Sequence, residues 1–347
     1  MPDVVELLKK VRKIEIVANR TVNDLLAGQY KSVFRGRGME FNEVREYEPG
    51  DDIRSIDWNV TARAGHPFIK RYVEERELTV LFLVDISASG LFGSNRSKIE
   101  GAIEAAATLM FSALKNNDKV GLLTFADAVR QFFPPRKGKA NVLRLIRELL
   151  ACEPASEGTD LCAALEYLNR VLRRRAVVFL MSDFLVPDLM NDADDLEEAE
   201  AERRNAPPIA NVPKSILQEA GEVSALFGRA YRHRLAHGSL ITPTLRALTI
   251  ASRRHDVVAM RIEDRREKEF PDIGLVTLRD AETGRTIQVD TASPRVRRWL
   301  AERRETVGRR IDESLRRTKT DLICVETDSD FVHSLRVFFD RRARSGS

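Results

Sequence analysis

The chain has 347 residues, of which 43% are hydrophobic and 32% charged, and it carries a formal net charge of +4. This composition supports a packed core with a charged surface, and so small a net charge gives no argument by itself for nucleic-acid binding. Residues 1–10 carry charges where a secretory signal peptide has an apolar block, and no uncharged apolar stretch reaches the roughly 18 residues of a membrane span, so we expect a soluble, cytoplasmic protein.

The first part of the chain differs from the rest in its pattern. We divide the sequence into an N-terminal extension at 1–77 and a main domain at 78–347. The extension begins with a helical pattern and continues with a polar segment. Pro49-Gly50 indicates a turn, and Asp51 or Asp52 can cap a short helical turn after it.

The central part of the chain alternates between strand and helix patterns. Residues 78–85 and 177–183 each contain an apolar run that ends in an aspartate, and such runs are typical of strands buried on both faces of a parallel sheet. The other elements expected here are a helix after the capping box Ser97-Lys-Ile-Glu100, strands at 120–125 and 128–133 (the second an edge strand stopped by Pro134-Pro135), and helices at 139–150 and 161–168. This order predicts right-handed crossovers and a doubly wound, mostly parallel α/β sheet of the Rossmann type.

An acidic, proline-containing insertion interrupts this pattern at 188–242, and we expect it to be mobile. The α/β pattern then resumes. The elements expected after the insertion are helices at 243–254, 294–319 and 331–339, strands at 256–262 and 322–325, and an inserted β-hairpin formed by 275–278 and 286–289.

The chain has three cysteines and no Cys-x-x-Cys pair. An odd and sparse set of this kind indicates reduced thiols, as in a cytosolic protein. Cys162 and Cys324 have apolar neighbours in the sequence, so we expect both in the core.

Five side chains with oxygen atoms follow strands or precede a helix. Asp85, Ser87 and Ser89 come at the end of the first apolar strand, Thr159 precedes a helix, and Asp183 ends the later strand. The carboxyl ends of parallel strands meet at one sheet edge, where ligands bind in α/β folds. Carboxylates and hydroxyls suit a small hard cation such as Mg²⁺ or Mn²⁺. An octahedral ion would keep a position open, which a partner's carboxylate could fill.

This set resembles the metal-ion-dependent adhesion site of von Willebrand factor A domains, in which Asp-x-Ser-x-Ser is followed by a distant Thr and by an Asp at a strand end. The tract Arg45-Glu-Tyr-Glu-Pro-Gly-Asp-Asp-Ile-Arg-Ser-Ile-Asp-Trp58, together with Arg254-His-Asp-Val-Val-Ala and Pro271-Asp-Ile-Gly-Leu-Val, resembles the bacterial domain-of-unknown-function family fifty-eight. The resemblance implies a von Willebrand factor A-like fold and a metal ion on the five residues. It also implies a non-enzymatic adaptor for a MoxR-type AAA+ ATPase, acting in protein assembly, maturation or stress tolerance.

A metal-dependent phosphoryl-transfer enzyme is one alternative, because such folds also place an Asp at the end of the first strand. Phosphatases of this kind usually need a second Asp two residues later as a general acid, and this chain has Ser87 there. The sequence has no phosphate-binding loop of the Gly-x-x-x-x-Gly-Lys-Ser/Thr type, and its five histidines have no zinc spacing.

Nucleic-acid binding is the other alternative. The helix expected at 294–320 has ten basic and four acidic residues, and an arginine-rich helix can follow a phosphate backbone. The arginines in question form doublets: Arg297, Arg298, Arg303, Arg304, Arg309, Arg310, Arg316 and Arg317. A solvent-facing, salt-bridged amphipathic helix is the simpler interpretation.

The acidic run at 192–202 closely follows Asp183. One hypothesis is that a carboxylate of this run occupies the open position on the ion and competes with a partner. A solvated linker is the simpler interpretation of such a segment.

Overall fold

The computed structural model of the chain describes residues 4–21, 30, 33–34, 39–74, 77–153, 158–186, 189, 242–279 and 286–345. Nearly all of the expected insertion at 188–242 lies outside the described residues, and so does the proposed metal gate at 192–202.

The core is a six-stranded sheet with the strand order β10-β7-β6-β3-β4-β5. Its strands are β3 (Thr79–Asp85), β4 (Lys119–Phe125), β5 (Val129–Arg136), β6 (Val177–Ser182), β7 (Asp256–Glu263) and β10 (Asp321–Glu326). All neighbouring pairs are parallel except β4 with β5, which is antiparallel at one edge. The expected doubly wound, mostly parallel α/β sheet is therefore confirmed.

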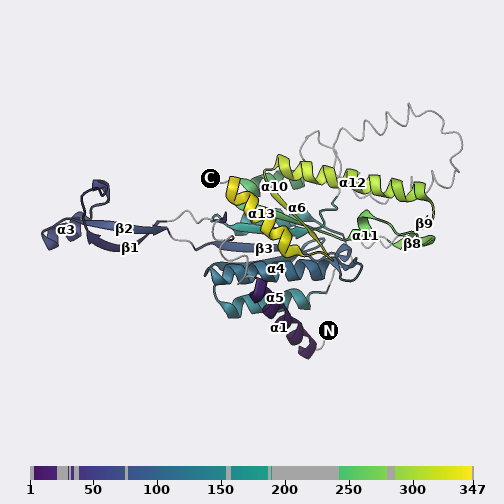
Figure 1. Ribbon diagram of the computed structural model, residues 1–347, viewed down its shortest axis with the longest axis horizontal. Helices are drawn as coiled ribbons and strands as arrows, with labels where there is room; N and C mark the ends of the chain where they lie inside the picture. Colours follow the sequence, from purple (N-terminus) through teal and green to yellow (C-terminus); the bar gives the residue numbers. More distant parts are fainter. Residues whose placement is uncertain are drawn as a thin grey trace.

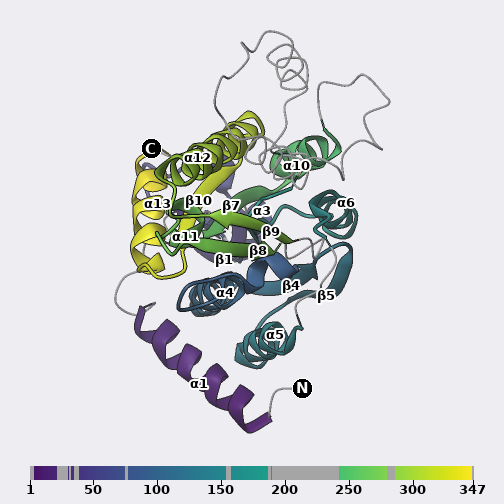
Figure 2. The same cartoon turned by 90° about the vertical axis from the view of Figure 1, so that its right-hand side faces the viewer.

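Helices cover both faces of this sheet (Figures 1 and 2). The helices on one face are α1 (Val4–Thr21), α4 (Lys98–Lys115), α5 (Lys139–Ala151) and α13 (Phe331–Ser345), and their apolar side chains belong to one buried cluster. Those on the other face are α6 (Leu161–Val171), α10 (Pro243–Arg254) and α12 (Pro294–Arg317), which pack into a second cluster. The expected helices at these positions are thus confirmed.

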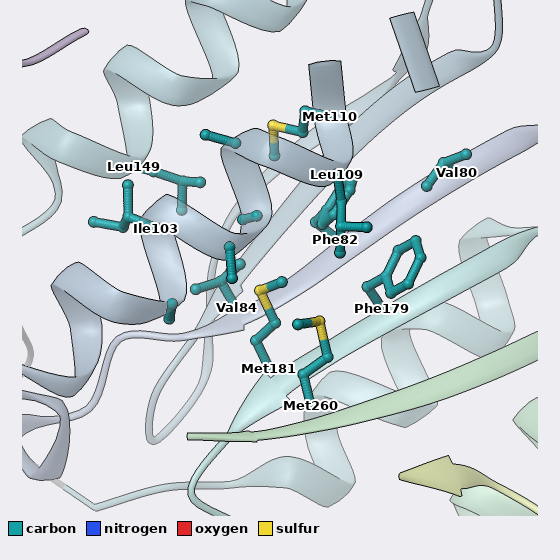
Figure 3. Packing of buried hydrophobic residues seen from close by; sticks show 14 of the residues in the cluster. Val80, Phe82, Val84, Ile103, Leu109, Met110, Leu149, Phe179, Met181 and Met260 are labelled. Atoms are coloured by element: carbon teal, nitrogen blue, oxygen red, sulfur yellow. The ribbon is translucent and has the colours of Figure 1, made fainter. Parts of the chain in front are cut away.

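The central strand β3 contributes to both apolar clusters because successive side chains point to opposite faces. Phe82 and Val84 pack on the α4 side, whereas Leu81 and Leu83 pack on the α6 side. Figure 3 shows Phe82 and Val84 next to residues of α4 and of the neighbouring strand β6. This two-sided burial explains why the strand is apolar without alternation.

The direction of the chain through the sheet changes beside β3. The chain moves from β3 to β4 and β5 on one side, and it later returns to β6, β7 and β10 on the other side. In doubly wound sheets, ligands bind at the carboxyl ends of the strands where the order reverses in this way. The ends of β3 and β6 therefore form the expected position of a site.

The extension contains an antiparallel pair that the sequence patterns did not predict, β1 (Met39–Glu46) with β2 (Phe68–Glu74). A bulge between Phe41 and Glu43 interrupts the pairing, which explains why β1 has no regular alternation. Between the strands lie η2 (Ile53–Ser55), capped by Asp52 as expected, and α3 (Trp58–Ala64). Figure 1 shows this unit projecting from the end of the sheet where β3 begins.

The remaining elements lie on the C-terminal side of the chain. The expected hairpin is confirmed as β8 (Leu275–Arg279) with β9 (Thr286–Asp290), and a short helix, α11 (Arg265–Lys268), was not expected. The expectation for Cys324 is wrong, because its side chain is exposed on the edge strand β10, whereas Cys162 is buried.

The expected end of the edge strand at Pro134 is also wrong, since β5 continues through both prolines to Arg136. Proline lacks a backbone N–H, and an edge strand tolerates this because its outer side has no partner. The bulge in the β4–β5 pairing brings this part of β5 close to Gly121. A Cβ on Gly121 would stand 2.9 Å from both the Phe133 carbonyl oxygen and the Pro135 ring.

Gly121→Ala is therefore expected to lower the free energy of unfolding by about 1–3 kcal/mol, because the added methyl group overpacks the strand pair. Gly308→Ala is the matched control, since its Cβ would meet no atom within 4 Å in the middle of α12. That variant should gain about 0.5–1 kcal/mol from helix propensity. Urea denaturation of the two variants measures both effects, and equal stabilities would contradict the packing argument.

Candidate metal site

The Asp85 carboxylate is fixed at the end of β3 by hydrogen bonds to both of its oxygens. The Ser87 backbone N–H donates to Oδ1 at 2.9 Å, and the Ser182 hydroxyl donates to Oδ2 at 2.7 Å. The hydroxyls of Ser87 and Ser89 lie 3.0 Å apart at the start of the short helix η3 (Ala88–Leu91). The first three candidate residues are therefore gathered within one turn of chain.

Asp183 follows β6 in the parallel register that places this strand beside β3. Its Oδ1 accepts the Leu185 backbone N–H at 3.1 Å, and its Oδ2 accepts the Lys98 ammonium at 2.7 Å. The next residue, the fully buried Phe184, has a φ of 57°, which is uncommon for a residue with a side chain. This sharp reversal ends the strand directly after Asp183.

Four of the five candidate residues line one pocket: Asp85, Ser87, Ser89 and Asp183. Its other lining residues are Gly90, Lys98, Ile99, Ala102, Met181, Ser182 and Ile262. Thr159 is not among the lining residues. It is held at the same sheet edge, because the backbone N–H of the next residue, Asp160, donates to the Ala126 carbonyl just after β4 at 2.7 Å.

The two carboxylates have opposite electrostatic environments. Burial, together with the nearby charge of Asp183, raises the pKa of Asp85 from its usual 3.8 to about 6. Burial also opposes the charge of Asp183, but the Lys98 ammonium outweighs this effect and lowers the pKa of Asp183. Asp183 therefore has a cationic partner within the protein, whereas Asp85 is held by neutral hydrogen-bond donors.

Sequence reasoning missed Lys98, Ser182 and Glu267. Lys98 was considered only as part of a capping box, which the structure confirms between Ser97 and Glu100. A lysine at the first position of a helix opposes the helix dipole, and this conflict is the signal that could have indicated a specific acidic partner. Ser182 immediately precedes Asp183, and Glu267 belongs to the unexpected helix α11.

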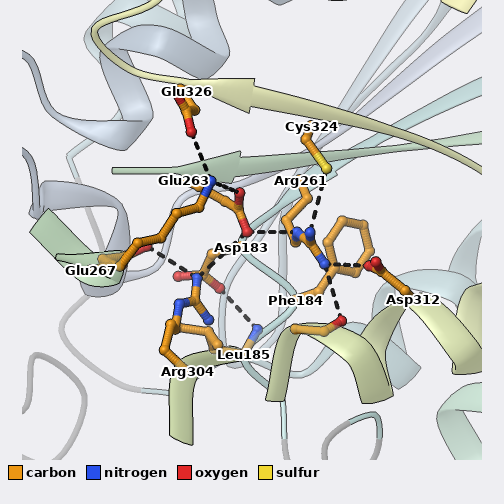
Figure 4. Close-up of polar contacts among 12 residues, drawn as sticks. Asp183, Phe184, Leu185, Arg261, Glu263, Glu267, Arg304, Asp312, Cys324 and Glu326 are labelled. Atoms are coloured by element: carbon orange, nitrogen blue, oxygen red, sulfur yellow. Dashed lines mark hydrogen bonds and ion pairs between the residues drawn. The ribbon is translucent and has the colours of Figure 1, made fainter. Parts of the chain in front are cut away.

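A network of charged side chains extends from the pocket along the ends of β7 and β10 (Figure 4). Arg304 of α12 approaches Glu267 at 3.2 Å and Glu263 at 3.8 Å. Lys268 joins Glu263 and Glu326 at 2.9 and 2.7 Å. Burial of the Glu263 carboxylate, which is 5% exposed, is possible because it has cationic partners in Lys268 and Arg304.

This network bears on the nucleic-acid alternative. Arg304 is bound to the acidic residues of the network, and Arg297 pairs with Asp272 at 3.1 Å and donates to the Ala292 carbonyl. These two arginines therefore have structural contacts inside the protein. Binding of nucleic acid would depend on other arginines of α12.

The donor set fits a hard divalent ion, since the pocket offers two carboxylates and several hydroxyl groups, and Asp85 has no cationic partner among the residues that the structure describes. Within the described part of the chain there is no cluster of three or more His, Cys, Asp or Glu residues that could hold a metal. A softer, nitrogen- or sulfur-based site is therefore not present among those residues, and the candidate site offers two carboxylates and the hydroxyls of Ser87, Ser89 and Ser182.

The fold and the pocket together define a doubly wound α/β protein with an oxygen-lined site at its switch point. Residues 43–203 and 227–309 match the family model described as "Protein of unknown function DUF58", and the chain belongs to this family. The resemblance noted in the sequence is thereby confirmed at the level of the family.

Relatives include the uncharacterized protein Rv1480 of Mycobacterium tuberculosis, which is 27% identical over 344 residues that cover 98% of this chain and 90% of the relative. The uncharacterized protein YeaD of Bacillus subtilis is 26% identical over 156 residues, covering 44% of this chain and 36% of the relative.

Two solved structures with similar architecture come from bacteria. BatB from Bacteroides thetaiotaomicron superimposes with a TM-score of 0.41 and 14% identity, covering 77% of this chain and 99% of that chain. The vWF domain of the type V pili tip protein Mfa5 from Porphyromonas gingivalis gives a TM-score of 0.40 and 14% identity, covering 78% and 94%.

None of the helices in the described part of the chain combines the length and the apolar character that crossing a membrane requires.

In the absence of metal, Asp85→Asn is expected to raise the free energy of unfolding at pH 7.5 by about 1–3 kcal/mol, because it removes a buried charge next to Asp183. The folded-state pKa of about 6 lies above the usual 3.8, so ionised Asp85 costs stability above pH 6. This cost shrinks as the pH falls from 6 to 3.8 and is absent below that. The difference in the free energy of unfolding between Asp85→Asn and the wild type should decrease over the same pH range. Denaturation in chelator across this pH range measures it.

Asp118→Asn is the matched control for this prediction. Asp118 lies just before β4, at the opposite sheet edge, and burial raises its pKa to about 7. In chelator, Asp118→Asn should also raise the free energy of unfolding. Added Mg²⁺ should still stabilise Asp118→Asn, whereas it should no longer stabilise Asp85→Asn. Equal responses of the two variants to Mg²⁺ would contradict the assignment.

Proposed function

We propose that the chain is a non-enzymatic, metal-dependent protein-binding module. Asp85, Ser87, Ser89, Thr159 and Asp183 would hold Mg²⁺ or Mn²⁺, directly or through water. The bound ion would supply a Lewis-acidic position for a carboxylate oxygen of a partner protein. The observation that carries the proposal is the meeting of the Asp-x-Ser-x-Ser residues and Asp183 in one pocket at the switch point of the sheet.

The chemistry of the pocket favours binding over catalysis. A nucleophilic serine needs a neighbouring base, and among the described residues the amine that lines the pocket is Lys98. Burial lowers the pKa of Lys98, but the charges of Asp183 and Glu267 outweigh burial and raise it overall, so the amine stays protonated. Ser87 also stands where a phosphoryl-transfer enzyme would need its general acid.

The surface beside the pocket suits a protein partner. Leu91 and Phe92 follow the motif serines directly and are 58% and 44% exposed. Exposed apolar side chains next to a polar site are typical of protein-binding surfaces. A partner that gives one carboxylate to the ion could bury these two side chains at the same time.

The proposed partner is a MoxR-type AAA+ ATPase or its client, and the role is that of an adaptor in protein assembly, maturation or stress tolerance. This part of the proposal rests on the family resemblance. Such a partner would need an accessible Asp or Glu at its contact surface, because the open coordination position selects for a carboxylate.

Titration calorimetry with Mg²⁺ and Mn²⁺ tests the metal site directly. The wild-type protein should bind one ion, and Asp85→Ala should weaken binding at least about 100-fold, because it removes a charged ligand rather than an outer contact. Asp118→Asn should bind like the wild type. Retention of wild-type affinity in Asp85→Ala would refute the site.

The partner surface has its own test, using capture of a purified MoxR-type ATPase from the same organism. Leu91→Ser with Phe92→Ser should weaken capture about tenfold or more without changing metal affinity, because the apolar contact is lost while the ligands remain. Ile250→Ser on α10 is the matched control, with 41% exposure at a site away from the pocket. Capture that is equally strong in chelator would rule out the bridging ion.

A further inference from the structure

Lys98 is a buried cation within the candidate metal site itself. Its side chain is 4% exposed, and its ammonium lies 2.7 Å from Asp183 Oδ2 and 2.7 Å from Glu267 Oε1. Lysine is rarely buried to this extent without partners. The same side chain lines the pocket formed by Asp85, Ser87 and Ser89.

The position of Lys98 conflicts with a metal ion on Asp183. The Asp183 carboxylate is already satisfied, since Oδ1 accepts a backbone N–H and Oδ2 accepts the ammonium. A divalent ion that contacts this carboxylate would stand close to the ammonium, and the two positive charges would repel each other across a buried site. One of the two contacts of Asp183 must therefore weaken when the other forms.

We propose that Lys98 is a tethered cation that competes with the metal for Asp183 and transfers its contact to Glu267 when the ion binds. This inference rests on the proposed metal site. Without metal, the ammonium neutralises Asp183 and keeps the pocket closed by an ion pair. With metal, the ammonium remains paired through Glu267 alone, so the buried charge is not left without a partner.

Glu267 connects this exchange to two other elements. Its second oxygen, Oε2, accepts Arg304 of α12 at 3.2 Å and the Asp264 backbone N–H at 3.4 Å. A stronger ion pair between Lys98 and Glu267 would therefore change the position of the Glu267 side chain, and with it the N-terminal cap of α11 and the contact of α11 with α12. This effect involves no direct contact between the ion and either helix.

The cap of α11 also holds the loop of the proposed partner surface. Asp264 accepts both the backbone N–H and the hydroxyl of Ser94, at 2.9 and 2.8 Å. Ser94 lies two residues after Phe92, one of the exposed apolar residues beside the pocket. The contacts from Lys98 through Glu267 and Asp264 thus link metal occupancy to the loop that would meet a partner.

Calorimetry on single and double variants tests this inference. Lys98→Met should bind Mg²⁺ about tenfold more tightly than the wild type, because the competing charge is gone. Glu267→Gln keeps the shape but removes the alternative partner of Lys98, so it should bind more weakly. In the Lys98→Met background, Glu267→Gln should have no further effect, since its influence acts through Lys98.

Hydrogen exchange supplies a second measurement that does not depend on affinity. Addition of Mg²⁺ should change the protection of backbone amides at 264–269 in the wild type and not in Lys98→Met. Lys268→Met is the matched control, because it removes a nearby ammonium that pairs with Glu263 and Glu326 and does not line the pocket. It should keep the wild-type metal affinity within about twofold.

The two proposals fail in different ways. If the wild type binds no divalent ion, the proposed function is wrong. If the wild type binds Mg²⁺ but Lys98→Met has unchanged affinity, or Glu267→Gln acts equally in both backgrounds, the competition is wrong and Lys98 is a structural counter-ion. Should Lys98→Met fail to fold, Glu267→Gln and hydrogen exchange in the wild type still decide, since an unchanged α11 on Mg²⁺ addition overturns the inference.

Discussion

The confinement of two carboxylates to one buried pocket is the constraint on which the rest of the site depends. Asp85 and Asp183 end neighbouring parallel strands, so the register of the sheet fixes them near each other. Like charges in a buried site raise each other's cost of ionisation. The two carboxylates are stabilised differently: Asp183 accepts a hydrogen bond from the Lys98 ammonium, whereas Asp85 accepts hydrogen bonds from the neutral donors of Ser87 and Ser182. Because the charge of Asp85 is not neutralised by an ammonium in the described part of the chain, an added cation would gain the most electrostatic stabilisation next to Asp85.

The surrounding architecture follows from the same requirement. Lys98 can be buried because it pairs with Asp183 and because α11 brings Glu267 to it, and Glu267 in turn contacts Arg304 of α12. Helices on both sides of the switch point are therefore joined by charges at the pocket, while separate apolar clusters hold each to the sheet. Stability of the fold and the electrostatics of the site thus depend largely on different side chains.

The central sheet could be predicted from the sequence because its strands are buried on both faces and read as unbroken apolar runs. Four of the five candidate residues could be proposed for the same reason, since they stand where two such strands end. Thr159 precedes a helix, and it was proposed from its place in the loop between the two strands. Lys98 could not be interpreted, because its partner Glu267 lies 169 positions away in a helix too short to have a pattern. The bulge in β1 breaks the alternation of apolar and polar residues, so the strand pair of the extension was not predicted. Cys324 was expected in the core, but β10 is an edge strand and its side chain is exposed.

The Lys98 ammonium supplies a positive charge within the candidate metal site itself, so the balance of charge there does not depend on a metal ion alone. In small zinc domains the free energy of metal binding is folding free energy, and the protein unfolds without the ion. Here, in the described part of the chain, the two apolar clusters contain none of the five candidate ligands, and Lys98 pairs with Asp183 at 2.7 Å. On the proposed function, Lys98 supplies the opposite charge for Asp183 when no ion is bound, and an exchangeable ion is free to control partner binding alone. An internal competitor would weaken that ion's affinity, which is what keeps such control reversible.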